Sequence, residues 1–273
     1  MTEKDVLRFS KTPEFQRPSL IVGWGKDAGK LGVKVIDFFN EKLASEEFCQ
    51  IKPTGFFSLG GVEVENDVVQ FPESTFYFCG RKDLIIFKSS EPQYEWYKFL
   101  NSVLDVAEMF NTRILYTIGG TISSISHTSP RRIFTVFNQP GLKKMFQDFG
   151  LVDMDYAGES ALSNHLLWAA KKRNIPGVSL WAEIPFYLAP VEDPKACKRV
   201  LEFFNQKFSL DIDLEEISQK IKTQNEEIHK LRRRSPVIDK YFSQLEGGFT
   251  LNEKEQERLA REVYQSLKKY KWE

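Results

Sequence analysis

The sequence predicts an α/β protein, with a mainly parallel sheet flanked by helices and an all-helical C-terminal extension. Up to about residue 212, short apolar runs alternate with longer segments of helical periodicity, which is typical of parallel strands joined by crossover helices. From residue 213 onward only the helical period remains. We therefore expect a core domain over residues 1–212 and an extension over residues 213–273, packed on the core or on a neighbouring subunit.

Strands are expected where short apolar or aromatic runs stand between Gly, Pro or charged residues. These runs are Ser19–Gly25, Thr75–Cys79, Leu84–Lys88, Ile114–Ile118, Ile133–Phe137 and Val178–Trp181. Glu63–Val69 alternates in polarity, which predicts an edge hairpin strand. Because open parallel sheets bind ligands at the carboxyl ends of their strands, function is expected there.

Helices are expected between the strands where apolar residues share one face. The periodicity predicts helices over 31–43 and 96–110 that lie on the sheet, with the aromatic residues of the second, Trp96 included, used in packing. Further helices are expected over Pro140–Phe149, Ser160–Arg173 and Pro194–Phe208, followed by a β-like segment at Ser209–Ile212.

The extension is predicted to contain three helices. The first has a narrow apolar seam formed by Leu214, Ile217, Ile221, Ile228 and Leu231 and interrupted by Gln224. Pro236 ends it, and a second, short helix runs to Gly247–Gly248. The segment Thr250–Glu253 fits a capping box, so a last helix is expected to use Leu259, Val263, Leu267 and Tyr270.

Composition argues against several classes of partner. Lys+Arg and Asp+Glu both number 38, so no positive field attracts nucleic acid or an anionic membrane. No apolar run reaches the roughly 18 residues of a membrane span, and we expect a cytoplasmic protein. Cys49, Cys79 and Cys197 are odd in number and far apart, which indicates buried free thiols and neither disulfides nor a metal site. No cofactor is expected.

The segment Gly23–Gly32 follows a strand, opens a helix and resembles a phosphate-binding loop. A dinucleotide fingerprint would need a third glycine where Ala28 stands. A phosphate-binding Walker loop would need Gly in place of Trp24 and a hydroxyl residue in place of Leu31. Two interpretations remain: a tight structural turn, or a turn whose free N–H groups attract an anion.

A second loop runs from Gly119 to Arg132, is rich in hydroxyl groups and follows a buried strand. It is either a solvated loop or one wall of a cleft shared with the first loop. His127 has no nucleophile or acid partner in its sequence neighbourhood, so no catalytic residue is assigned. The candidate ligand-binding residues are Trp24, Asp27, Gly29, Gly119, Gly120, Thr121, His127 and Arg131.

Several segments, in this order, resemble the proteasome assembly chaperone family in its archaeal and bacterial branch. They are GWGKDAG, EPQYEW, GGT with HTSP, SLWAEIPFYL and DPKA, within residues 15 to about 245. The residues that carry most of the resemblance are Glu91, Pro92, Gln93, Tyr94, Trp96, Trp181, Pro185 and Tyr187. Ser129 and Phe186 depart from the family, which commonly has Arg and His at these positions.

The resemblance implies an α/β fold related to nucleoside phosphorylases and a closed homo-oligomer, with a trimer as the first expectation. It also implies proteasome subunits or another protein complex as partners. Two functions stay open: a non-catalytic protein-binding oligomer, or an enzyme or sensor that binds an anionic or nucleoside-like ligand in the cleft. Fold alone does not decide between them.

Overall fold

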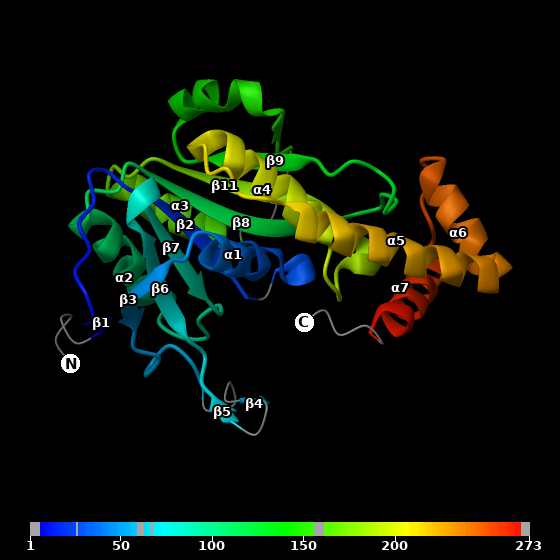
Figure 1. Ribbon diagram of the computed structural model, residues 1–273, viewed down its shortest axis with the longest axis horizontal. Coiled ribbons are helices and arrows are strands. Elements are labelled where there is room, and N and C mark those ends of the chain that lie inside the picture. Colours follow the sequence, from blue (N-terminus) through cyan, green and yellow to red (C-terminus); the bar gives the residue numbers. More distant parts are fainter. Residues whose placement is uncertain (1–5, 26, 59–62, 66–67, 156–160, 269–273) are drawn as a thin grey trace. The chain divides into compact units, whose positions relative to one another are not determined.

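The computed structural model describes residues 6–25, 27–58, 63–65, 68–155 and 161–268. Its main sheet has nine strands in the order β1-β3-β6-β7-β2-β8-β11-β9-β10, and β4 and β5 form a separate hairpin (Figure 1). The strands are β1 (Leu7–Phe9), β2 (Ser19–Trp24), β3 (Glu46–Ile51), β4 (Glu63–Glu65), β5 (Val68–Gln70), β6 (Ser74–Cys79), β7 (Leu84–Ser89), β8 (Ile114–Ser123), β9 (Ile133–Phe137), β10 (Val152–Asp153) and β11 (Gly177–Pro185).

The α-helices are α1 (Leu31–Lys42), α2 (Trp96–Met109), α3 (Leu162–Lys172), α4 (Pro194–Phe208), α5 (Glu215–Arg234), α6 (Pro236–Glu246) and α7 (Glu253–Leu267). Shorter 3-10 turns are η2 (Ala28–Lys30), η4 (Gly80–Lys82) and η6 (Phe186–Leu188). The segment predicted as a helix over Pro140–Phe149 is also a 3-10 helix, η5. None of these helices, within the described part of the chain, is both long and apolar enough to span a membrane.

The predicted fold class is confirmed. The central strand β2 pairs in parallel with β7 and with β8, whereas β6, β3 and β1 extend the sheet beyond β7 in antiparallel fashion. Three strands, β1, β3 and β10, were not predicted. β1 and β10 are very short, and β3 begins with Glu46 and Glu47, which break the apolar pattern.

The β-like segment predicted at Ser209–Ile212 is not a strand. Ser209 ends α4 in the left-handed conformation, with φ 49°. The Asn205 side chain then bonds to both backbone groups of Ile212, at 2.9 and 3.2 Å. Because a side chain satisfies these backbone groups, the segment has no need of a strand partner.

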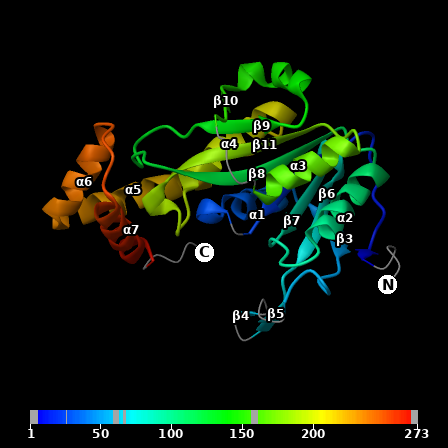
Figure 2. The ribbon, with the colours of Figure 1, turned by 180° about the vertical axis from the view of Figure 1, so that it is seen from behind.

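The chain divides into two compact units, whose chain segments are 1–26, 32–119 and 135–180 in the first and 27–31, 120–134 and 181–273 in the second. In the first unit, α1 covers one face of the sheet and α2 and α3 cover the other (Figures 1 and 2). Leu20, Val22 and Trp24 of β2 belong to the same core cluster as the buried faces of α2 and α3. Most of the phenylalanines are buried in the protein's hydrophobic cores or pack against them.

In the second unit, α5 contacts α4, α6 and α7, and α7 contacts η6. Ile217, Ile228 and Leu231 of the predicted seam are buried. Gln224, which interrupts the seam, is also buried and donates to the Glu192 carbonyl at 2.8 Å. The capping box of α7 uses Asn252 and Glu255, two residues later than predicted, and Tyr270 lies outside the described residues.

Candidate functional site

The turn after β2 and the end of β8 meet within the second unit. Asp27 Oδ2 accepts a hydrogen bond from the Gly120 N–H at 3.0 Å. A Cβ atom on Gly120 would lie 2.4 Å from the Ala28 carbonyl oxygen, so only glycine permits this approach. Gly29 has φ 68° and its N–H donates to the Ala189 carbonyl. Backbone groups of the turn are thus bonded to the protein itself.

Two other residues predicted to line a cleft, Trp24 and Gly119, belong to the first unit. Trp24 is only 2% exposed, and its indole Nε1 donates to the Ser163 hydroxyl at 3.1 Å. Its ring packs edge-on against Phe87. Contrary to the prediction that it lines a cleft, the Trp24 side chain is part of a core.

His127 is buried in the second unit, although the sequence indicated no partner for it. Its Nδ1 lies 3.1 Å from the Tyr187 hydroxyl, and its ring packs edge-on against Phe242 with centroids 5.0 Å apart. Burial, together with the charges of Arg232 and Arg131, lowers the pKa of His127 to about 3. A neutral histidine in such surroundings is a packing residue.

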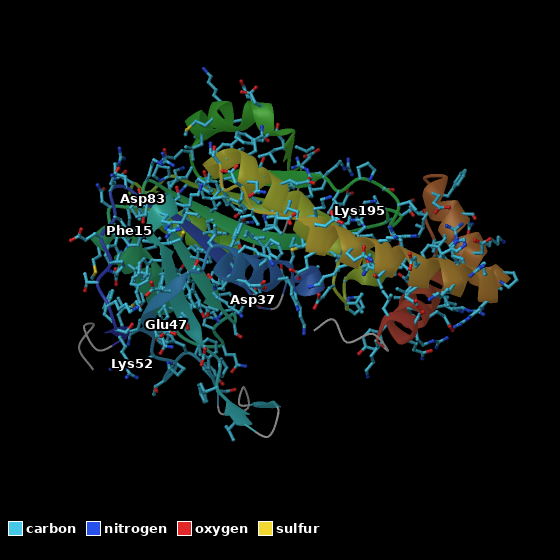
Figure 3. All side chains as sticks on the ribbon, in the orientation of Figure 1. Phe15, Asp37, Glu47, Lys52, Asp83 and Lys195 are labelled. Carbon is cyan, nitrogen blue, oxygen red and sulfur yellow. The ribbon has the colours of Figure 1, made fainter. Side chains whose placement is uncertain are left out.

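Arg131 forms an ion pair that is closed to solvent. Its Nε donates to Asp193 Oδ2 at 2.7 Å, with both side chains almost fully buried, and its Nη1 donates to the Ser126 and Ser129 carbonyls. Asp193 also caps α4. Lys195, labelled in Figure 3, donates to the His127 and Thr128 carbonyls. These bonds hold the 126–131 loop against the start of α4.

Glu183 is a second buried carboxylate, and no sequence pattern pointed to it. It accepts hydrogen bonds from Arg132 at 2.8 and 2.9 Å and from the Ser123 hydroxyl at 2.8 Å. Burial would raise the pKa of Glu183, but the hydrogen bonds from Arg132 and Ser123 outweigh burial and lower it. The group is therefore an anchored anion without the raised pKa of a general acid.

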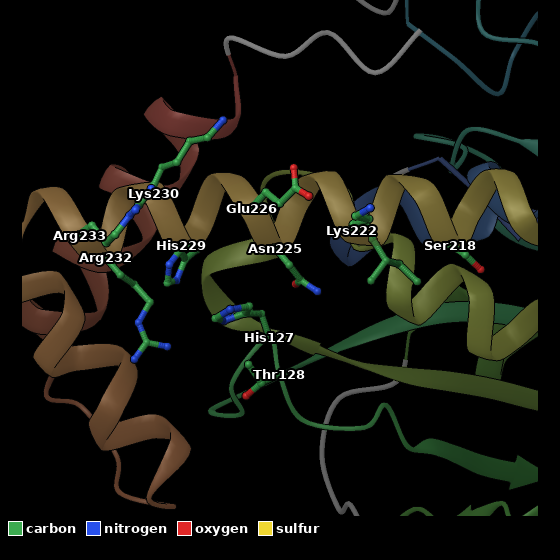
Figure 4. A pocket seen from close by; sticks show the side chains of 11 residues that line it. His127, Thr128, Ser218, Lys222, Asn225, Glu226, His229, Lys230, Arg232 and Arg233 are labelled. Carbon is green, nitrogen blue, oxygen red and sulfur yellow. The ribbon is translucent and has the colours of Figure 1, made fainter.

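An open hollow of about 710 Å³ adjoins His127 and Thr128 in the second unit. Figure 4 shows Asn225 and His229 of α5 facing these two residues. Lys222 and Arg233 add positive charge at the hollow. Sequence reasoning missed α5 as a wall because its polar face is indistinguishable from an ordinary solvated helix face.

The candidate residue Thr121 is partly exposed near the end of β8. Of the motif residues in this unit, Trp181 is partly buried and Pro185 and Tyr187 are buried. The indole Nε1 of Trp181 is buried and makes no hydrogen bond with the described residues.

The motif residues of the first unit lie mostly on the surface. Glu91 is partly exposed and Pro92 is buried, whereas Gln93 and its successors through Lys98 are exposed. Gln93 Oε1 accepts from the Ser58 N–H at 2.8 Å. Trp96, predicted to pack on the sheet, is 44% exposed. Helix α2 starts at Trp96, four residues after Pro92.

We call the exposed side chains of Tyr94, Trp96, Tyr97 and Trp168 the aromatic patch. Their exposed fractions are 55%, 44%, 67% and 45%. Trp168 comes from α3 and the others from α2 or the residues before it. Sequence reasoning missed this patch because a helical period of aromatic residues predicts burial, and it does not show which residues at a helix start turn outward.

No His, Cys, Asp and Glu side chains gather into a possible metal site within the described ranges. The three cysteines are buried and free. Burial raises the pKa of the Cys49 thiol to about 12, which opposes thiolate chemistry at Cys49.

The PAC2 family profile matches residues 20–232. The chain belongs to the PAC2 family. A curated relative, the uncharacterised protein MJ1210 of Methanocaldococcus jannaschii, is 25% identical over 137 residues. That match covers 50% of this chain and 52% of MJ1210, so it spans about half of either protein.

Solved structures share the PAC2 fold. PbaB of Pyrococcus furiosus, an archaeal proteasome activator, superposes with a TM-score of 0.72 at 20% identity, over 83% of this chain and 98% of PbaB. Rv2125 of Mycobacterium tuberculosis, a proteasome-assembly chaperone homologue, gives 0.68 at 18% identity, over 78% and 94%. At these identities the likeness concerns the fold.

Proposed function

We propose that this PAC2 protein is a non-catalytic, protein-binding homo-oligomer of the cytoplasm that assists a proteasome or another multisubunit complex. The observation that carries the proposal is the internal use of the strand-end polar groups. Arg131 is paired with Asp193, Glu183 with Arg132, and His127 with Tyr187. These groups stabilise the loops and leave little chemistry for a substrate.

Support from the comparisons points the same way. One structural neighbour is a proteasome activator and another is a proteasome-assembly chaperone homologue. A protein that binds other proteins needs an accessible surface with large side chains, and the aromatic patch supplies one. Three copies remain the first expectation for the oligomer.

Capture from the host's own lysate tests this proposal. The tagged chain should enrich the subunits of one complex, proteasome α subunits first among them, in a quantitative mass-spectrometric comparison. An unrelated tagged protein of similar mass is the control, and excess untagged chain should compete the enrichment away. Light scattering should give a multiple of 31.7 kDa. A monomer that enriches no complex would contradict the proposal.

A second candidate function is binding of an anionic or nucleoside-like small molecule. The observation that favours it is the hollow beside His127, where Lys222 and Arg233 provide positive charge. Its ligand would be held by these cations and by the amide of Asn225. Ligand-induced thermal stabilisation separates the two candidates.

A further inference from the structure

We propose that the aromatic patch on α2 and α3 is the surface through which one copy of this chain binds a second copy. The inference rests on the homo-oligomer of the proposed function and assigns its contact surface. Scattered exposed hydrophobic residues are ordinary in monomers, but a contiguous cluster of tryptophan and tyrosine is typical of interfaces.

The patch is contiguous across two helices. The rings of Tyr97 on α2 and Trp168 on α3 meet edge-on, with centroids 6.1 Å apart. Trp96 meets His165 of α3 in the same way at 6.3 Å. Figure 2 shows the two helices side by side on one face of the sheet. The side chains of Trp96, Tyr97 and Trp168 therefore form one surface along the two helices, and Tyr94 stands two residues before Trp96.

The backbone at the start of α2 favours this outward arrangement. Glu95, directly before Trp96, adopts the left-handed conformation with φ 51° and makes no side-chain cap bond. This conformation is unfavourable for a residue with a Cβ atom and recurs at functional sites. Phe99 and Leu100 return to the core in the next turn.

The exposed area of the patch matches the centre of an interface. Aromatic side chains bury about 150–250 Å² each when fully covered, so four that are half exposed offer on the order of 400 Å². A standard interface buries about 800 Å² per partner. The patch thus supplies about half of one side of such an interface, and it does so with residue types that dominate binding energy.

Charges beside the patch are complementary between its two helices. Asp105 and Glu108 lie on α2, and Arg173, just after α3, donates to both at 2.6 and 3.0 Å. Both acidic side chains nevertheless remain about half exposed, at 51% and 49%. We call Asp105 and Glu108 the acidic margin. Because these carboxylates are half exposed, they can accept further cations from outside the chain.

Lys171 and Lys172 form a basic margin at the end of α3, opposite in charge to the acidic margin. Lys171 and Lys172 are both exposed, and Lys172 Nζ lies 3.7 Å from the centroid of the Trp168 ring. The basic margin of one copy fits the acidic margin of another, as a self-associating surface requires. The formal net charge of the chain is zero, so whole copies do not repel one another. These complementary charges favour a second copy as the occupant.

A double variant tests the proposal in the full-length chain. Tyr97→Ser with Trp168→Ser removes the centre of the patch and should weaken self-association on the order of 100-fold, since interface aromatics are frequent hot spots. Met109→Ser is the matched control, because Met109 is 58% exposed on the same helix and about 18 Å along it from Tyr97. Light scattering across a dilution series measures each mass.

The outcomes separate this inference from the proposed function. Wild type and Met109→Ser should be oligomers at concentrations where the double variant is a monomer. A double variant that keeps the wild-type mass overturns the patch while the homo-oligomer stands. A wild type that is monomeric throughout the series overturns both.

Iodide quenching of wild-type tryptophan fluorescence is the second measurement, and it does not depend on the variant folding. Quenching should increase on dilution as Trp96 and Trp168 become accessible. Quenching that stays constant while the mass falls would overturn the proposal.

Discussion

At the residue scale, buried ionisable side chains hold the 126–131 loop in place. His127 is kept neutral by its burial against Tyr187 and Phe242, and Arg131 forms a buried ion pair with Asp193. A buried neutral histidine and a buried ion pair respond differently to substitution. Each therefore gives a distinct prediction.

Replacing His127 should flatten the acid side of the stability curve. The folded-state pKa, about 3, lies below the unfolded value of about 6.5. Between these pH values the unfolded chain binds a proton that the folded chain does not, so stability falls as pH falls, by up to about 1.4 kcal/mol per pH unit. In His127→Gln this contribution disappears.

Urea unfolding of both proteins from pH 7 to pH 4.5 measures the effect of His127. His229→Gln is the control, because it removes an exposed histidine of α5 in place of a buried one. Parallel stability curves for wild type and His127→Gln would show that His127 does not stay neutral.

Replacing Arg131 should be strongly destabilising. Arg131→Met leaves the Asp193 carboxylate buried without its cation, which costs about 3–5 kcal/mol of unfolding free energy. Adding Asp193→Asn removes the lone charge and keeps an oxygen that can cap α4, so the double variant should recover part of the loss. Chemical unfolding measures all three proteins. If the double variant recovers nothing, lost packing and not the buried charge explains the cost.

At the element scale, the turn after β2 and the end of β8 are brought together by a close approach of their backbones. The Gly120 N–H binds Asp27, and the Ala28 carbonyl occupies the space that a Gly120 side chain would need. Elements fixed in this way tolerate no added methyl group unless the backbone moves.

Gly120→Ala should therefore destabilise the protein by about 1–3 kcal/mol, the usual cost of overpacking. Its matched control is Gly141→Ala in η5, where an added Cβ atom would meet nothing within 4 Å and stability should stay within about 0.5 kcal/mol of wild type. Thermal unfolding compares the two. Equal melting temperatures would mean that Gly120 and the Ala28 carbonyl are not in close contact.

At the scale of the whole molecule, the question is whether the protein acts through a surface or through a cavity. The strand-end groups are bonded internally, whereas the hollow beside His127 is open. A ligand that binds only the folded state must stabilise it. If the protein acts through a surface and binds no small ligand, as the proposed function holds, small molecules should leave its global stability unchanged.

Thermal shift with phosphate, nucleosides and nucleotides checks this prediction, and no change in melting temperature is expected at millimolar concentrations. At 100 times its dissociation constant a ligand would add about 2.7 kcal/mol. A dose-dependent rise that Lys222→Ala with Arg233→Ala abolishes would favour the small-molecule alternative. Lys240→Ala, an exposed lysine of α6, is the control.

The sequence by itself determined the fold class and most elements. Apolar runs and helical periods report burial locally, so β2, β7 and β9 and the helices α1 to α4 could be placed within a few residues. The strand β3 could not, because its charged start conceals its pairing. The division into a 1–212 core and a 213–273 extension remains a prediction. The contacts within the chain define two units with other boundaries.

Only the tertiary structure decided the partners of the polar and aromatic side chains. Residues 60 positions apart pair at His127 and Tyr187, and 62 apart at Arg131 and Asp193. No local pattern encodes such a pairing. Trp24 ends β2 and Trp96 begins α2, and one is 2% and the other 44% exposed. Exposure depends on what the rest of the chain packs against each ring, which is a property of the folded molecule.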